Sequence, residues 1–169
     1  SVTATGVTLT WSAAASAVNY TVEYKLASSS TWTGTSIVTG TSKALTGLSV
    51  GSNYDWRVRT NCSSSNSAYV QSTFTTNCNP PTALKYTNTT TDSSTISWTA
   101  ATGAINYTYE YKLSYNTTWT NTTTTTNISE RIGILNAGSQ YNWQVKANCP
   151  SVSSAFVSSN VYTPCPEPT

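Results

Sequence analysis

The stretch YDWRVRTNC at residues 54–62 and its near-copy YNWQVKANC at residues 141–149 decide how this chain folds. In both stretches apolar and polar side chains alternate, as in a β-strand with one face against a core and the other in water. In the second stretch this pattern places Tyr141, Trp143 and Val145 on the inner face. The duplication predicts that the surrounding sequence is also built from two copies of one unit.

The duplication extends along the whole chain with a spacing of 87 residues and needs no gap. It pairs Trp11 with Trp98, Tyr20 with Tyr107, Tyr24 with Tyr111, Trp32 with Trp119, Leu48 with Leu135, Tyr54 with Tyr141, Trp56 with Trp143, Cys62 with Cys149 and Cys78 with Cys165. Solenoid repeats recur every ~20–50 residues, so this period is that of a domain. We expect one domain over residues 1–77, a second over 78–164 and the start of a following repeat over 165–169.

The second copy predicts seven short strands and shows no helical periodicity. The expected strands cover residues 82–87, 94–99, 106–113, a Thr-rich stretch around Trp119, 128–134, 141–148 and 155–162. Strands of this number and spacing are typical of an antiparallel β-sandwich. The first copy has the same strands except the first, because Ser1 aligns with Asn88. The expected fold is all-β, with two tandem immunoglobulin-like antiparallel β-sandwiches.

The composition argues against several classes of function. The 169 residues carry a net charge of +2, and only 8% are charged, so no basic surface is expected for nucleic acid or an anionic membrane. The absence of histidine removes the commonest general base and the imidazole ligands of metal sites. No apolar run is long enough to span a bilayer. We predict that the chain is not an enzyme, holds no cofactor or metal, and does not insert into a membrane.

Several duplicated residues form a pattern that is known from one family. They are the tryptophan of the second strand (Trp11, Trp98), the Tyr-x-x-x-Tyr of the third (Tyr20/Tyr24, Tyr107/Tyr111) and a leucine six residues before a tyrosine corner (Leu48/Tyr54, Leu135/Tyr141). With these residues each copy resembles a fibronectin type III domain. The stretches 54–62 and 141–149 are more narrowly similar to type III modules in large secreted proteins of Bacteroidetes, which include surface adhesins and glycan-degrading enzymes. The resemblance implies an extracellular or cell-surface location.

The four cysteines recur with the repeat. Cys62 and Cys78 lie at opposite ends of the hairpin expected from residues 54–61 and 69–76. Roughly 26 Å of strand would separate them, whereas a disulfide tolerates about 7 Å between Cα atoms. In a type III sandwich the chain enters at the pole where the sixth strand ends, so the resemblance implies a disulfide between Cys78 and Cys149. By the same rule Cys62 and Cys165 would pair outside this sequence and stay unpaired within it.

The expected disulfide indicates an oxidising compartment. A bond closing a loop of this length contributes about 4 kcal/mol on the loop-entropy model. The alternative is a set of metal-binding thiols. It lacks a Cys-x-x-Cys pair and any histidine, so the disulfide is favoured.

Trp32 and Trp119 are the candidate ligand-binding aromatics. We expect each to fall on a short, Thr-rich edge strand, where its ring can lie flat on the surface and stack on a sugar. The ring can equally fold over the edge of the core and shield it. Both copies keep the tryptophan beside the strand of Tyr24 or Tyr111, which favours packing over carbohydrate stacking.

A polar strip is the second candidate site. It comprises Glu23, Lys25, Asp55, Arg57 and Arg59, and in the second copy Glu110, Lys112, Asn142, Gln144 and Lys146. The strip can face a ligand, or it can form a cross-strand charge ladder in which each pair contributes about 0.2–1 kcal/mol. The second copy has lost two of the three charges on its sixth strand, which favours the ladder.

The repetition, the expected disulfide and the lack of a recognisable catalytic or metal-binding pattern together favour a non-catalytic extracellular structural or adhesion module. It would be a crosslinked spacer in a tandem array, whose partners are neighbouring repeats of the same chain. The two prolines between Asn77 and Pro81 would restrict the hinge between repeats. Self-association into a filament is a variant of this hypothesis. The alternative is a carbohydrate-binding accessory module of a secreted polysaccharide-degrading enzyme.

Overall fold

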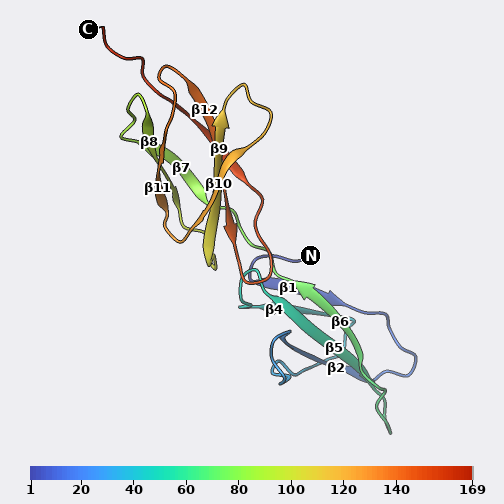
Figure 1. The fold of residues 1–169 in the computed structure, drawn as a ribbon. Coiled ribbons are helices and arrows are strands. Elements are labelled where there is room, and N and C mark those ends of the chain that lie inside the picture. Colours follow the sequence, from blue (N-terminus) through green and yellow to red (C-terminus); the bar gives the residue numbers. More distant parts are fainter. Residues whose placement is uncertain (169) are drawn as a thin grey trace. The chain divides into compact units, whose positions relative to one another are not determined.

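The computed structural model of the chain describes residues 1–168, which form thirteen strands and no helix (Figure 1). The Cα positions divide the chain into two compact units, Ser1–Asn77 and Cys78–Thr169. Each unit is a pair of antiparallel sheets. The all-β fold predicted from the alternating sequence pattern is confirmed.

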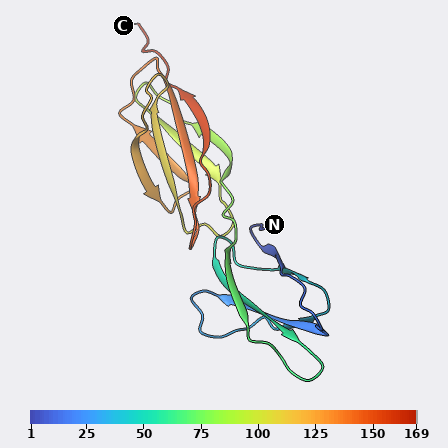
Figure 2. The same ribbon diagram turned by 90° about the vertical axis from the view of Figure 1, so that its right-hand side faces the viewer.

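The second unit contains seven strands. They are β7 (Thr82–Thr87), β8 (Ser93–Thr99), β9 (Asn106–Leu113), β10 (Thr120–Thr125), β11 (Ser129–Gly133), β12 (Gln140–Asn148) and β13 (Val157–Tyr162). One sheet has the order β11-β8-β7 and the other β10-β9-β12-β13. The second view shows the long strands of this unit running side by side (Figure 2). The expected strands therefore form, and where a bound that the sequence analysis gave differs from the observed one, it does so by one or two residues.

The first unit contains six strands within the described residues. They are β1 (Gly6–Thr10), β2 (Asn19–Leu26), β3 (Ser36–Val38), β4 (Ser42–Thr46), β5 (Asn53–Asn61) and β6 (Val70–Thr75). Its sheets have the orders β1-β4 and β3-β2-β5-β6. Strand β1 corresponds to β8, but no strand of residues 1–168 pairs with it on the side where β7 pairs with β8.

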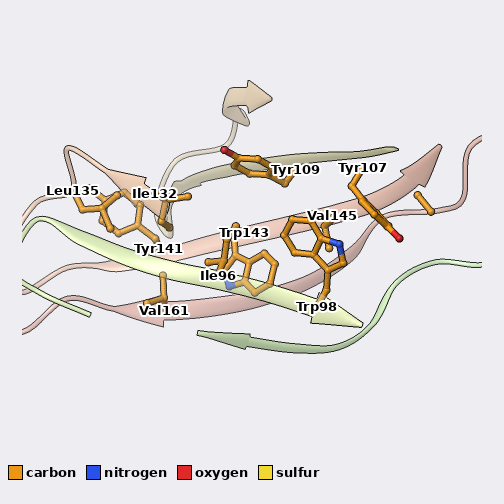
Figure 3. Packing of buried hydrophobic residues seen from close by; sticks show 11 residues of the cluster. Ile96, Trp98, Tyr107, Tyr109, Ile132, Leu135, Tyr141, Trp143, Val145 and Val161 are labelled. Atoms are coloured by element: carbon orange, nitrogen blue, oxygen red, sulfur yellow. The ribbon is translucent and has the colours of Figure 1, made fainter. Parts of the chain in front are cut away.

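The core of the second unit lies between its two sheets (Figure 3). Trp143 and Val145 of β12 and Ile96 of β8 have no exposed surface. Trp98 packs against Trp143 with their ring centroids 6.4 Å apart. The predicted inward alternation along β12 is thus confirmed, since Tyr141, Trp143, Val145 and Ala147 are all buried.

The tyrosine corner has the same geometry in both units. The backbone N–H of Ser49 donates to the hydroxyl of Tyr54, and that of Asn136 donates to the hydroxyl of Tyr141, at 2.9 Å in each case. The hydrogen bond lets a large aromatic ring enter the core while its polar end stays satisfied. This corner positions β5 and β12 and therefore the residues on their outer faces.

Candidate functional site

The outer face of the sheet β3-β2-β5-β6 carries the polar strip of the first unit. Glu23 lies opposite Arg57 in the register of β2 and β5, and Lys25 lies opposite Asp55. The Arg57 Nε donates to the Glu23 carboxylate at 2.6 Å. The Lys25 Nζ lies 2.8 Å from Asp55 Oδ2. The cross-strand charge ladder expected from the sequence is therefore formed.

Arg57 also lies between two aromatic rings. Its guanidinium carbon is 4.2 Å from the ring centroid of Trp32 and 4.1 Å from that of Tyr69. The Lys25 ammonium lies 5.4 Å from the Trp32 centroid, and Arg59 lies 5.0 Å from that of Tyr69. A guanidinium stacks favourably on an aromatic face through both charge and its flat shape. One face of Trp32 is thus occupied by cations of the same unit.

The sequence analysis did not identify Tyr69 as a member of this site. A usable signal was present, because Tyr69 aligns with Phe156 at the 87-residue spacing. In the second unit Phe156 lies 4.9 Å from the Lys146 ammonium. Both aromatics precede the last strand of their unit, and nothing in the alternation of the strands themselves indicates that they turn toward the sheet.

The corresponding face of the second unit is less charged. Gln144 stands where the first unit has Arg57, and its amide donates to Glu110. The Lys112 ammonium lies 4.9 Å from the ring centroid of Trp119 and also donates to the carbonyl of Asn116. No arginine is thus placed to stack on Trp119 among the described residues.

The two candidate tryptophans lie in loops rather than on the edge strands. Trp32 precedes β3 by several residues, and Trp119 comes immediately before β10, so their expected placement on those strands is wrong. The reason in the first unit is local. The N–H groups of Thr33 and Gly34 both donate to the carbonyl of Tyr24, which shapes the chain into a loop beside β2. Both tryptophans are half-buried, with their rings turned toward lysines of the neighbouring strand.

A shallow hollow lies beside Trp119 on the outer face of the second unit. It has a volume of about 390 Å³ and is lined by Lys112, Trp119, Asn142, Ser158, Ser159 and Asn160. An aromatic ring next to amide, hydroxyl and ammonium groups offers both stacking and hydrogen bonding to a polar ligand. Beside Trp32 the surface differs, because Arg57 stacks on the ring.

The structure joins Cys78 to Cys149, with their Cα atoms 6.0 Å apart. Cys78 precedes β7 in one sheet, and Cys149 follows β12 in the other, so the bond crosslinks the two sheets at one pole. The same bond is the pairing that the fibronectin resemblance implied. Cys62 and Cys165 are free thiols in the structure, the first half-buried and the second exposed.

Two kinds of titratable group in the second unit have shifted pKa values. Hydrogen bonds from Thr90 and Ser93 lower the pKa of the Asp92 carboxyl. Burial raises the pKa of the Tyr109 and Tyr111 hydroxyls. None of the three lines the hollow beside Trp119. The first shift follows from hydrogen bonds in the turn before β8, and the other two follow from packing in the core.

The described residues contain no group of three or more His, Cys, Asp or Glu side chains that could hold a metal ion. Residues 1–168 also include no helix long and apolar enough to cross a membrane.

Comparison with known proteins gives similarity at the level of structure. No protein-family model matches the sequence, and no curated protein matches it. A two fibronectin type III domain segment from chicken tenascin superposes with a TM-score of 0.83 at 22% identity, over 96% of this chain and 95% of that one. A redesigned β-sandwich protein gives 0.50 at 19% identity, over 53% and 94%. Chicken CNTN1 FN1-FN3 domains give 0.48 at 14% identity, over 96% and 61%.

The tenascin segment matches both units at once and over nearly their full length. At this level of identity the likeness shows the fold and leaves the ligand open. Together with the two-sheet units and the shared tyrosine corner, it shows that the chain folds as two tandem fibronectin type III domains.

Proposed function

We propose that the chain is a non-catalytic extracellular module that acts as a crosslinked spacer in a tandem array on a secreted or cell-surface protein. One observation carries the proposal, namely the disulfide between Cys78 and Cys149 within an 87-residue repeat. A structural disulfide indicates an oxidising compartment. Repeats of equal length suit a spacer, because each one adds the same distance. The partners would be neighbouring repeats of the same chain, and the array would extend a terminal domain away from the surface.

The position of the disulfide suits a module that is pulled at its ends. Tension applied before Cys78 passes through the bond to Cys149, because the two cysteines are covalently joined. The chain between them, a sequence separation of 71, then cannot be extended. At about 3.6 Å per residue, roughly 25 nm of chain is kept out of reach of the force. A spacer built this way keeps its length even when the sandwich loosens.

Single-molecule stretching of the whole chain tests this role. We expect unfolding of the second unit to add roughly 25 nm less length in the oxidised protein than after reduction. The first unit lacks an internal disulfide and serves as the control within the same molecule, with an equal gain in both states. Equal gains for the second unit in both states would remove the observation on which the spacer role rests.

A carbohydrate-binding accessory role is the second candidate, and the hollow beside Trp119 favours it. Its lining of one aromatic ring with amide, hydroxyl and ammonium groups suits a sugar. Trp32 is the less suitable stacking platform, because Arg57 covers one face of its ring.

Retention on a panel of insoluble polysaccharides tests the second role. We expect a Trp119→Ala variant to lose retention and a Trp32→Ala variant, which is the matched control, to keep it. Retention that is lost equally in both variants would contradict a site at the Trp119 hollow. No retention of the unaltered chain on any polysaccharide would exclude the candidate role for the sugars tested.

A further inference from the structure

The two units differ by one charge beside their loop tryptophans. In the first unit Lys25 lies opposite Asp55 in the register of β2 and β5, and its ammonium is 2.8 Å from Asp55 Oδ2. In the second unit Lys112 lies opposite Asn142, whose amide carries no charge. No salt bridge to Lys112 forms within residues 1–168. The second unit therefore has the same cation without the carboxylate that neutralises it in the first.

The Lys112 side chain is nevertheless held in a defined place. It is half-buried, its ammonium lies 4.9 Å from the ring centroid of Trp119, and it donates to the carbonyl of Asn116. The acid on the same face of β9, Glu110, accepts a hydrogen bond from the Gln144 amide instead. An ammonium has three N–H donors, and Asn116 takes one of them. The remaining donors can serve an anionic ligand.

The hollow of about 390 Å³ beside Trp119 surrounds this ammonium with neutral polar groups. Lys112 is the one charged residue among the described residues that line it. Across β9, β12 and β13 the register places Lys112, Asn142 and Asn160 in one row. Because neighbouring strands are about 4.8 Å apart, the row spans about 10 Å. Amides both donate and accept hydrogen bonds, so the row suits a hydroxylated ring that carries one acid group.

A second hollow shares Lys112 with the first. Its volume is about 310 Å³, and its polar lining includes Lys112, Asn116, Thr120, Asn121 and Asn136. Lys112 is again the one charged residue among the described lining. Both volumes fall in the range of about 300–1,000 Å³ that is typical of small-ligand sites. Two adjoining hollows on either side of one cation suit a polymer better than an isolated small molecule.

We propose that the two hollows bind neighbouring sugars of a polysaccharide that contains uronic acid, and that the Lys112 ammonium pairs with the carboxylate of the uronate. The inference rests on the carbohydrate-binding role, the second candidate above, and names its substrate class. The ring of Trp119 contacts the C–H groups of the sugar, and the amides of Asn142 and Asn160 bond to its hydroxyls. The charge-assisted hydrogen bond from Lys112 gives the preference for an acidic sugar.

The equivalent face of the first unit is unsuited to the same ligand and provides a control within the molecule. The Lys25 ammonium is already paired with Asp55, and Arg57 stacks on the ring of Trp32. A uronate carboxylate would have to compete with Asp55 for the lysine and would be repelled by it. We therefore expect the uronate to bind to the second unit.

Titration calorimetry on the whole chain tests the proposal with two soluble uronate polymers, polygalacturonate and alginate, each beside its carboxyl-reduced form. Reduction of the carboxylate to a primary alcohol keeps the sugar rings and linkages and removes the charge. The pair of forms therefore isolates the contribution of the carboxylate. We expect at least one uronate polymer to bind about tenfold or more tightly than its reduced form, as for a hydrogen bond to a charged group.

Four variants locate this preference. Lys112→Gln should bind the uronate polymer and its reduced form equally, whereas Lys112→Arg should keep the preference because it keeps the charge. Asn142→Asp leaves Lys112 in place and supplies the carboxylate that the first unit has, so the preference should be lost there too. Lys25→Gln is the matched control and should keep it. Thermal unfolding checks that each variant is folded. A preference that persists in Lys112→Gln or in Asn142→Asp would overturn the proposal.

The behaviour of the unaltered chain separates this inference from the role on which it rests. Equal binding of the uronate and reduced forms, or binding of neutral polysaccharides alone, would overturn the uronate inference and leave the carbohydrate-binding role standing. Failure to bind any polysaccharide would overturn both.

Two further probes distinguish other anions. Polyglutamate at the same concentration of carboxylate should bind less tightly than the uronate polymer, because it has no sugar ring for Trp119 and the amides. Equally tight binding of polyglutamate would assign the site to an acidic peptide and overturn the proposal. A sulfated galactan that binds more tightly than both uronate polymers, with the same dependence on Lys112, would assign the site to sulfate and likewise overturn it.

Discussion

The two units have nearly the same inward-facing residues and yet differ in how well they bury them. Trp98 is 4% exposed and Trp143 has no exposed surface, whereas Trp11 and Trp56 at the same positions are half-buried. The difference arises from one strand, β7, and the segment that precedes it. A β-sandwich core is thus a joint property of two layers, and a side chain suited to burial is buried only when both layers are complete.

The largest difference in stability between the two units is expected when the central tryptophan of each unit is truncated. Trp143→Ala should destabilise the second unit by about 4–5 kcal/mol, at the upper end for a buried aromatic, because the ring is fully enclosed. Trp56→Ala should cost the first unit clearly less, because its ring already contacts water. Amide hydrogen exchange with mass spectrometry, resolved by unit, measures both changes. Equal losses of stability would show that the side of the first unit on which Trp56 lies is covered in solution.

The second largest effect is expected from the disulfide. Replacing Cys78 and Cys149 by Ser together should cost the second unit about 4 kcal/mol, because the unfolded chain regains the freedom of a long loop. The matched control is Cys62→Ser with Cys165→Ser, which removes two free thiols and should change the stability of either unit little. Chemical unfolding of both double variants checks this. A control that is as destabilised as the disulfide variant would contradict the assignment of these two thiols as free.

At alkaline pH the stabilities of the two units should change differently. Tyr109 occupies the position of Val22, and its hydroxyl has a pKa raised by burial. The unfolded chain therefore loses this proton first, near pH 10, and the second unit loses stability as the pH rises above that value. Below pH 10 the contribution is fully present. Tyr109→Phe should flatten the decline, as measured by unfolding at several pH values. A decline of unchanged steepness would assign it to other groups.

The smallest expected effect concerns the charge ladder. Glu23→Gln removes the carboxylate that pairs with Arg57 in the first unit, and should cost less than about 1 kcal/mol because the pair is partly exposed. The equivalent change Glu110→Gln removes only a partner of the Gln144 amide and should cost less still. Thermal unfolding at low and high salt measures both. A larger cost for Glu110→Gln than for Glu23→Gln would mean that the ion pair with Arg57, the cation stacked on Trp32, contributes little to stability.

The sequence predicted the fold well because its main signals are periodic. Alternation in residues 141–148 fixed which side chains enter the core, and the 87-residue spacing transferred that assignment to residues 54–61. The candidate site was harder. Trp32 and Trp119 lie in loops, where no periodicity indicates the direction of a side chain, and Tyr69 reaches Arg57 across a turn. Trp11 and Trp56 pack against the core of the first unit but are only partly buried, because their burial depends on a partner layer as well as on their own strands.

The spacing of the cysteines also sets a problem for oxidative folding. Cys62 and Cys78 are only sixteen residues apart, as are Cys149 and Cys165, whereas the native partners Cys78 and Cys149 are separated by 71. In an unfolded chain the shorter loops close more readily, by about 1.3 kcal/mol or roughly tenfold. During synthesis Cys78 also meets Cys62 long before Cys149 exists. The wrong bond should therefore form first and must be exchanged as β12 folds, so the yield of this protein depends on a thiol–disulfide isomerase or a thiol buffer.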